Sequence, residues 1–268
     1  PVTQEKVKMK IPKTEKSILT FAEVNKTFGS VTALSNVSFE IPDGECTAIV
    51  GDNGAGKSTL VKIMSGVLRQ DSGSLYLNNI SYQPSGPSEA RALGLETVYQ
   101  DLALCDALNS VENIFLGREL GRGWPHALSI PKRKDMKRHV EELISRTGVN
   151  IPAPSTMVRR LSGGQRQGLA IARALAFEAK LIVLDEPTAA LGVRETGHVE
   201  DLIKQVISQK RSVVIVSHNM EQVFRVAQNV LVMRQGRVVL QAKTSETNPQ
   251  ELVACITGAS LAANKKND

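Results

Sequence analysis

The chain has 268 residues, which suits one large domain or two modest ones with a proper hydrophobic core. Hydrophobic residues make up 41% and charged residues 22%, as is ordinary for a globular protein. Aromatic residues are only 4%, which argues against a protein that stacks nucleic-acid bases on aromatic side chains. The formal net charge of +6 suits an anionic partner, and nucleotide phosphates, nucleic acid or an anionic membrane surface would all satisfy it.

The spacing of the cysteines and the hydropathy of the chain further restrict the class of protein. Cys46, Cys105 and Cys255 lie far apart and form no CxxC pair, so we expect neither a zinc site nor a disulfide scaffold, and a reducing compartment fits. No run of 18 apolar residues exists to span a bilayer. The N-terminus lacks a hydrophobic signal core, so we expect the chain to stay in the cytoplasm.

In chain order, residues 1–16 are polar, rich in lysine and without apolar periodicity, which predicts a basic, disordered extension. Short β-like runs and one helix follow, with a turn at Pro42-Asp43-Gly44. The predicted strands are Ile18–Val24, Val37–Ile41, Thr47–Val50, Leu75–Leu77 and Glu96–Tyr99, and the helix is Ser58–Val67.

The second half changes character twice. Residues 101–177 read as mainly helical, interrupted by the glycine-rich segment Gly117–Gly123, and Lys134–Ser145 is amphipathic. Three β runs follow, and the first two are near-continuous apolar runs typical of strands buried on both faces of a parallel sheet. These runs are Lys180–Leu184, Ser212–Val216 and Val230–Met233; a short strand, Arg237–Gln241, and a helix near Pro249–Ile256 come after them. Because helices separate the strands, we expect an α/β core with a helical insertion. The sequence shows no internal repeat.

A glycine-rich loop carries the first chemical signal. The segment GDNGAGKS, residues 51–58, follows the predicted strand Thr47–Val50 and fits the pattern GxxxxGK[ST]. Its glycines let backbone N–H groups wrap around phosphates, and the helix that follows adds its N-terminus. Lys57 would neutralise β- and γ-phosphate oxygens, and Ser58 would ligate Mg²⁺. The plainer alternative is a chance glycine-rich turn before a lysine, which the strand–loop–helix context disfavours.

Two acids end the apolar run Lys180–Leu184. A carboxylate at a strand tip beside a phosphate loop can hold Mg²⁺, which is the role we assign to Asp185. Glu186 could polarise the attacking water as a general base. Such an acidic pair, taken alone, is more often a turn or a helix cap.

The segment Leu161-Ser162-Gly163-Gly164-Gln165 is the most specific signal. Ser162 can cap a helix that begins at Gly163, with Gln165 as its capping-box partner. A cap does not need two consecutive glycines, however, and these leave N–H groups open to an anion. LSGGQ is the signature of ATP-binding-cassette (ABC) proteins, and from Ile18 to about Gly258 the chain resembles that family.

The resemblance implies a P-loop NTPase (RecA-like) α/β core with an antiparallel β subdomain and an inserted α-helical subdomain. It divides the ABC ATPase domain, residues 17–260, into a nucleotide-binding core (17–101 and 179–260) and a helical subdomain (102–178), followed by a polar tail at 261–268. It implies ATP and Mg²⁺ as the groups bound. The implied ATP contacts are Phe28, Gly51, Asp52, Asn53, Gly54, Ala55, Gly56, Lys57, Ser58, Thr59, Ser162, Gly163, Gly164 and Gln165; the metal ligands are Ser58, Gln100 and Asp185; the catalytic residues are Lys57, Gln100, Glu186 and His218.

Three of these assignments rest on position within the family pattern. Gln100, after Val98-Tyr99, resembles the Q-loop glutamine that senses Mg²⁺ and water and contacts the membrane partner. His218 resembles the switch histidine at the γ-phosphate, although a lone histidine after a strand is more often structural. Phe28 resembles the aromatic residue that stacks on adenine; Tyr is commoner there, and a core or edge Phe is the alternative.

One position departs from the family. The segment that usually reads SALD is Ala189-Ala190-Leu191-Gly192 here, so Gly192 cannot supply the carboxylate that links the two ATP sites. Family members sandwich two ATP molecules head to tail between two cassettes. The resemblance therefore implies a dimer with a second copy, or with another ABC ATPase chain, and looser coupling between the sites.

Three features resemble carbohydrate importers, in the single-cassette form described for monosaccharides. They are the segment Ser110–Arg118, the stretch Pro187–Gly192 and Gly192 itself. This resemblance implies integral membrane permease subunits, indirectly a solute-binding protein, and a peripheral place on the cytoplasmic face of the cell (inner) membrane. The alternatives are a non-sugar importer, an exporter, or a soluble ABC ATPase that acts on nucleic acid or ribosomes. For the last, the basic residues of 132–139 are the candidate patch, but a solvated helix face is the simpler interpretation, and we expect no nucleic-acid partner.

Overall fold

The computed structural model of the chain describes residues 16–119, 121–122, 130–149, 151–177 and 179–259. The expected basic extension lies outside these ranges apart from Lys16, whose ammonium pairs with the Asp43 carboxylate at 2.8 Å. The expected polar tail at 261–268 lies outside them entirely. Within the described ranges, no helix is long and apolar enough to cross a bilayer.

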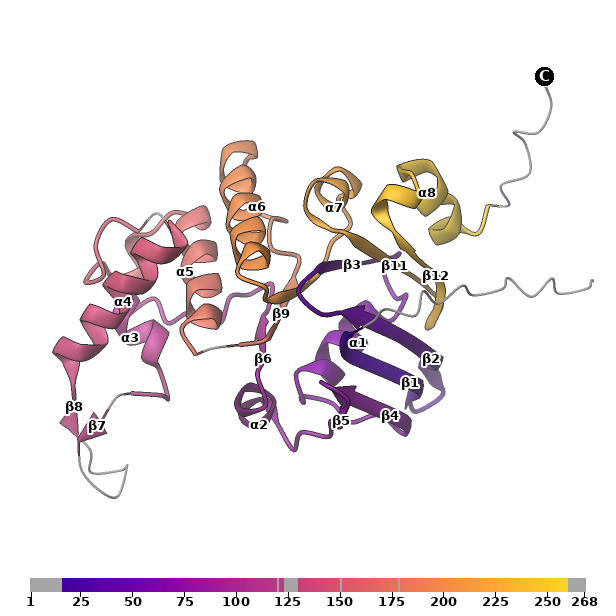
Figure 1. Ribbon diagram of the computed structural model, residues 1–268, viewed down its shortest axis with the longest axis horizontal. Helices are drawn as coiled ribbons and strands as arrows, with labels where there is room; N and C mark the ends of the chain where they lie inside the picture. Colours follow the sequence, from indigo (N-terminus) through magenta and orange to yellow (C-terminus); the bar gives the residue numbers. More distant parts are fainter. Residues whose placement is uncertain (1–15, 120, 123–129, 150, 178, 260–268) are drawn as a thin grey trace, which may run out of the picture.

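A six-stranded sheet forms the centre of the molecule, with the strand order β12-β11-β3-β10-β9-β6 (Figure 1). All neighbours pair in parallel except the edge strand β12, which runs antiparallel to β11. The strands are β3 (Cys46–Val50), β6 (Leu95–Val98), β9 (Leu181–Asp185), β10 (Ser212–Val216), β11 (Asn229–Arg234) and β12 (Arg237–Lys243).

Both faces of this sheet are buried, as its near-continuous apolar strands predict. In β10, Val213 and Ile215 point to one face and Val214 and Val216 to the other. The first face packs against four helices, α5 (Gly163–Leu175), α6 (Val193–Ser208), α7 (Met220–Val226) and α8 (Pro249–Thr257). The second face shares a core with α1 (Lys57–Met64) and with a smaller sheet.

The smaller sheet is antiparallel, with the order β2-β1-β4-β5. Its strands are β1 (Ser17–Phe28), β2 (Val31–Pro42), β4 (Ser72–Leu77) and β5 (Ile80–Ser81). Phe21 and Phe39 stack across β1 and β2 with ring centroids 4.5 Å apart. The helix α1, which begins at the glycine-rich loop, shares one hydrophobic core with both sheets.

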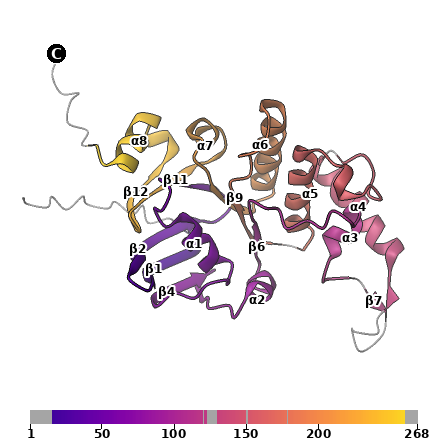
Figure 2. The same cartoon turned by 180° about the vertical axis from the view of Figure 1, so that it is seen from behind.

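A helical part lies at the other end of the molecule, away from the antiparallel sheet (Figure 1, Figure 2). It contains α3 (Ser110–Phe115), α4 (Arg133–Thr147), a 3-10 helix (Val158–Arg160) and α5, with the short strands β7 (Gly121–Arg122) and β8 (Ile130–Pro131). The remaining elements are α2 (Pro87–Ala92) and a 3-10 helix at Thr244–Glu246. The α/β core, the antiparallel sheet and the helical insertion expected from the sequence are thus confirmed.

The element bounds differ from the sequence predictions where backbone geometry intervenes. The first helix ends at Met64 rather than Val67, because Gly66 has a φ of 73° that no helix can contain. Strands β1 and β2 run longer than predicted. Shifts in their pairing register interrupt the alternation of apolar and polar residues by which a strand is predicted from sequence. Asp185 is the last residue of β9, paired with Val216, rather than the first residue beyond the strand.

Candidate functional site

The glycine-rich loop joins the end of β3 to the start of α1 and is shaped by two glycines that no other residue can replace. Gly51 has a φ of 153°, and a Cβ added to it would lie 2.3 Å from the Met233 carbonyl oxygen. Gly56 has a φ of 103°, and its Cβ would lie 2.8 Å from the Ala33 oxygen. Because backbone atoms cannot move aside cheaply, both positions demand glycine. The result is a loop whose outer residues, Asp52–Gly54, face solvent.

Lys57 lies inside this loop. Its ammonium donates hydrogen bonds to the Gly51 oxygen at 2.6 Å and the Asp52 oxygen at 2.8 Å, and the residue is only 9% exposed. Burial lowers the pKa of Lys57, and the neighbouring Glu186, Asp52 and Asp185 carboxylates oppose that shift. The loop therefore holds a positive charge at its centre, where a phosphate group would enter, while Ser58 is exposed and Thr59 half-buried beside it.

Two carboxylates lie at the end of β9, at the same edge of the sheet: Asp185 is the last residue of the strand and Glu186 follows it. Burial raises the pKa of Asp185, and the nearby negative charge of Glu186 raises it further, while Lys57 and Lys62 oppose the shift. Glu186 adopts a left-handed backbone with a φ of 52°, and its N–H donates to the Val216 oxygen at the end of β10. A non-glycine residue in this conformation costs about 1–3 kcal/mol, so the fold holds Glu186 in place against strain.

His218 completes this edge from the loop after β10. Its Nδ1 lies 2.7 Å from the Glu186 Oε2, with the histidine side chain 68% exposed and the glutamate 21%. A cavity of about 560 Å³ opens beside the pair, lined also by Thr188 and Ser217. The contact orients the Glu186 carboxylate, which also lines this cavity.

Gln222 supports the pair and was not anticipated from the sequence. Its side-chain oxygen accepts hydrogen bonds from the Ser217 hydroxyl at 2.8 Å and the Thr188 hydroxyl at 3.1 Å. It is fully buried in the first turn of α7. One side chain therefore ties the loop after Glu186 to the loop that carries His218. No sequence pattern marks it, because the contact depends on how α7 packs.

The predicted metal ligands come from three separate elements. Ser58 lies on α1, Asp185 ends β9, and Gln100 is exposed just beyond β6. Their oxygens are the donors that a hard cation such as Mg²⁺ prefers. Within the described residues, no cluster of three or more His, Cys, Asp or Glu side chains could hold a metal by itself. By its chemistry, the donor set of one hydroxyl, one carboxylate and one amide oxygen fits Mg²⁺.

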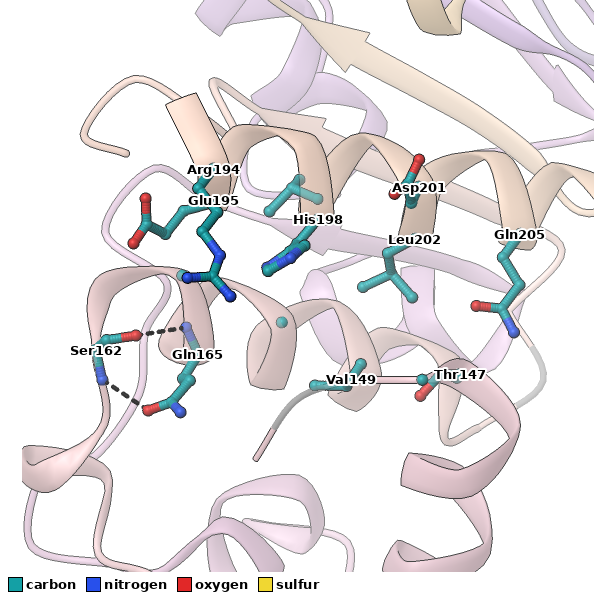
Figure 3. A pocket seen from close by; sticks show the side chains of 14 residues that line it. Thr147, Val149, Ser162, Gln165, Arg194, Glu195, His198, Asp201, Leu202 and Gln205 are labelled. Carbon is teal, nitrogen blue, oxygen red and sulfur yellow. Dashed lines mark hydrogen bonds between the residues drawn. The ribbon is translucent and has the colours of Figure 1, made fainter. Parts of the chain in front are cut away.

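The signature segment lies in a different place and has a different character. The Ser162 hydroxyl accepts from the Gln165 N–H at 3.3 Å, and the Gln165 side-chain oxygen accepts from the Ser162 N–H at 2.9 Å, so the predicted capping box is present. Figure 3 shows this turn beneath α6, where Arg194, Glu195 and His198 point toward it across a cavity of about 490 Å³. The turn is a fully capped helix N-terminus that faces outward.

Gly164 has a structural reason of its own to be glycine. An added Cβ would lie 2.7 Å from Cγ and 3.0 Å from Cβ of Glu195, so α5 and α6 meet closely here. Gly192 is the N-cap of α6 and has no side chain to cap it. The place its Cβ would take is 2.8 Å from the Glu195 Oε2. Glu195 thus fills the side-chain space of two glycines, a contact that sequence spacing does not reveal.

Phe28 ends β1 and is 46% exposed, so it is not a core residue. The Lys26 ammonium lies 5.6 Å from the centre of its ring. Lys26 is itself held by Asp71 at 2.6 Å. An exposed ring with a cation near it is an available platform for stacking.

The fold thus brings Lys57, Asp185, Glu186 and His218 to one edge of the six-stranded sheet. Among the described residues, no hydrogen bond or ion pair joins this edge to the signature turn at Ser162–Gln165. The two parts of the predicted site are therefore built as separate surfaces.

Comparisons with known proteins place this arrangement in a family. The profile described as ABC transporter matches residues 34–189, more than half of the chain. The chain is 41% identical to the xylose/arabinose import ATP-binding protein of Sulfolobus acidocaldarius, over 91% of this chain and 95% of that protein. It is also 41% identical to the fructose import ATP-binding protein of Rhizobium meliloti, with the same coverage. A ribose import ATP-binding protein of Rubrobacter xylanophilus is 37% identical, but the chain spans only 47% of its length.

Solved structures agree. One similar structure is the dimeric post-hydrolysis state of an ATP-binding cassette bound to ADP and Pi, with a TM-score of 0.71, 25% identity, and coverage of 84% of this chain and 98% of that one. Another is cbiO1 from Clostridium perfringens, part of the ABC transporter complex cbiONQ, with a TM-score of 0.75, 28% identity, and coverage of 92% and 96%. The chain belongs to the ABC transporter family and is an ATP-binding, ATP-hydrolysing cassette of it.

Proposed function

We propose that the chain is the ATP-hydrolysing subunit of an importer for a monosaccharide. The observation that carries this proposal is its 41% identity, over nine-tenths of its length, to import ATP-binding proteins for xylose/arabinose and for fructose. The intact phosphate loop, the Glu186–His218 pair and the capped signature turn supply the chemistry that such a subunit needs.

During hydrolysis, side chains of this chain orient the phosphates and the attacking water, and one of them accepts a proton from that water. Lys57 leaves the carbonyls of its loop to neutralise charge on the β- and γ-phosphates. Glu186 accepts a proton from the attacking water, and the strained backbone and the His218 contact keep its carboxylate in position. His218 also faces the γ-phosphate from the end of β10. Mg²⁺, held by Ser58, Asp185 and Gln100, would neutralise charge on the phosphates.

The second part of the ATP site comes, in this proposal, from a second copy of the chain or from another cassette chain. The signature turn faces outward with its helix N-terminus and lies apart from the chain's own phosphate loop. Head-to-tail pairing would set Ser162, Gly163, Gly164 and Gln165 of one copy against the γ-phosphate held by the other. The dimeric cassette with bound ADP and Pi, which this chain is similar to, supports such a pairing.

Transport further requires integral membrane permease subunits, and indirectly a solute-binding protein that selects the sugar. The chain would then lie peripherally on the cytoplasmic face of the cell membrane. A cavity of about 400 Å³ between α3 and α4 offers a surface for a permease segment: Leu108, Val111, Leu116 and Met136 give it an apolar lining, with Glu112 and Arg133 among its charged residues. Leu116 is 50% exposed there.

The test is co-purification from membranes. A tagged chain carrying Glu186→Gln, which we expect to hold ATP without turnover, is isolated with its membrane partners in mild detergent, and the partners are identified by mass spectrometry. The wild-type complex is then reconstituted in vesicles with a candidate solute-binding protein. We expect a pentose or hexose on that protein to stimulate ATP hydrolysis several-fold. Recovery with RNA or ribosomes, lost as the salt is raised, would instead support the nucleic-acid alternative.

A further inference from the structure

The loop that follows Gln100 has an unusual backbone. Leu102 and Ala103 both adopt left-handed conformations, with φ values of 58° and 44°. Neither residue is glycine, and each such residue costs about 1 kcal/mol or more. Two tight contacts close the loop: the Leu102 N–H donates to the Tyr99 oxygen at 2.9 Å, and the Ala103 N–H donates to the Asp101 oxygen at 2.7 Å. Something outside the loop has to hold it in this shape.

Arg173 is positioned to do so. Its guanidinium donates to the Ala103 oxygen at 2.7 Å through Nη1 and to the Leu102 oxygen at 2.8 Å through Nη2. Both carbonyls thus point at one planar fork, which is a geometry that arginine can satisfy and lysine cannot. The two strained residues are the two that Arg173 holds.

A group of charged residues lies near this arginine. Arg173 lies close enough to Glu96 on β6 for the carboxylate to oppose the lowering of its pKa that burial causes. Glu96 is 8% exposed and pairs with Arg118 at 2.5 Å. Arg118 in turn lies over the Phe177 ring, 4.3 Å from its centroid. Glu96 lies on β6, four residues before Gln100. The charged group of Glu96, Arg118 and Arg173 is therefore next to the strand that leads into the loop after Gln100.

Arg173 also belongs to the helix that begins at the signature turn. It lies in the last turn of α5, eleven residues after Ser162, or about 16 Å along the helix axis. We propose that Arg173 is a positioning residue, which holds the loop after Gln100 in its left-handed shape and so ties the orientation of Gln100 to the signature helix. One rigid helix, α5, then links two events in the same chain. These are the contact of its signature turn with a second copy and the placement of Gln100 at the ATP held by its own phosphate loop.

This inference rests on the role proposed above for Gln100, so Gln100→Ala is studied in parallel. The main variant is Arg173→Lys, which keeps the charge beside Glu96 and loses the fork. The matched control is Arg138→Lys on the exposed face of α4, where the guanidinium makes only a 3.5 Å contact to Asp135. Thermal unfolding of each protein separates local effects from a general loss of stability.

The first readout is hydrogen exchange in the peptide that covers residues 99–105. Loss of a charge-assisted pair of hydrogen bonds predicts roughly tenfold faster exchange there in Arg173→Lys, with the rest of α5 unchanged. The second readout is the Mg²⁺ concentration that gives half-maximal ATP hydrolysis. It should rise about fivefold in Arg173→Lys, in the same direction as in Gln100→Ala, and stay constant in Arg138→Lys.

Unchanged exchange in residues 99–105 of folded Arg173→Lys would overturn the inference. So would a normal Mg²⁺ dependence in that variant beside an altered one in Gln100→Ala. A normal dependence in Gln100→Ala would instead remove the proposed role of Gln100, while the exchange result would still decide whether Arg173 holds the loop. If Arg173→Lys does not fold, Ala103→Pro decides from the loop side. It forbids the left-handed φ without touching α5, and wild-type exchange and Mg²⁺ dependence in it would contradict the inference.

Discussion

The phosphate-loop edge and the signature turn are two regions built on opposite principles. At the edge, the backbone is strained and closely packed. Gly51 leaves no room for a Cβ beside the Met233 carbonyl, Glu186 is left-handed, and the Lys57 ammonium is enclosed by its own loop. At the signature turn, Ser162 and Gln165 satisfy each other in a relaxed capping box. In the function proposed here, the strained edge therefore carries the chemistry, whereas the relaxed turn offers a preformed helix N-terminus to an anion.

The largest effect should come from the strained edge. Glu186→Gln keeps the size of the side chain but removes the proton acceptor, so we expect kcat to fall by about three orders of magnitude. ATP affinity should stay within about twofold, because the phosphate loop is untouched. Steady-state hydrolysis and nucleotide titration check both numbers. Hydrolysis within tenfold of wild type would remove Glu186 as the general base.

The signature turn should be sensitive to shape rather than to charge. In Gly164→Ala the new methyl group would lie 2.7 Å from the Glu195 Cγ, so either Glu195 or the start of α5 has to shift. We expect kcat/KM to fall by about 100-fold, the loss typical of a small misplacement at a reacting centre. Gly197→Ala on α6 is the matched control, because its Cβ meets nothing within 4 Å. Equal activity in the two variants would show that the close contact at Gly164 carries no function.

Phe28 tests the periphery of the strained edge. Removal of its exposed ring in Phe28→Ala should weaken ATP binding about tenfold, the size of one lost stacking contact, with kcat unchanged at saturation. Phe28→Tyr should bind within about twofold of wild type, because it keeps the π-face. Fluorescent-nucleotide titration measures both, with Ile80→Ala on β5 as the control, because Ile80 is likewise an exposed apolar side chain. Normal affinity in Phe28→Ala would return Phe28 to a plain edge residue.

The smallest effect is one of stability. Burial raises the pKa of Asp185 above its ordinary 3.8, so the charged carboxylate costs free energy in the folded state once the pH exceeds that value. Asp185→Asn without nucleotide should therefore raise Tm by a few degrees at pH 7 and lose activity. The gain should shrink as the pH falls through the raised pKa of Asp185 and vanish well below 3.8, where the carboxyl is protonated in both the folded and the unfolded state. Calorimetry at several pH values checks this, with Asp135→Asn as the exposed control; no gain at pH 7 would contradict it.

The sequence predicted most of the strained edge, because its signals are contiguous. The loop 51–58, the pair Asp185-Glu186 and the turn 162–165 each lie within a few residues, and the strand before each of the first two is apolar. Periodicity likewise gave β10 with its observed bounds. These features depend on local chain geometry, which spacing records.

The supporting contacts could not be predicted, because they join elements distant in sequence. Gln222 bridges two loops only because α7 packs where it does, and Glu195 fills the space of Gly164 from another helix. Arg173 reaches a loop seventy residues away. Helix periodicity marks such residues as partly buried at most; their partners follow from the packing of α5, α6 and α7 on the sheet.

The central claim is that one ATP site needs the edge of one chain and the turn of another. Two variants in the Glu186→Gln background test it by ATP-dependent dimerisation in sedimentation: Lys57→Ala, which spoils the edge, and Gly164→Asp, which spoils the turn. Each alone should remain monomeric, since both of its sites are damaged. Mixed together they share one intact site, so we predict that ATP drives about half of the chains or more into dimers. A mixture as monomeric as its components, beside a dimeric Glu186→Gln parent, would contradict the account.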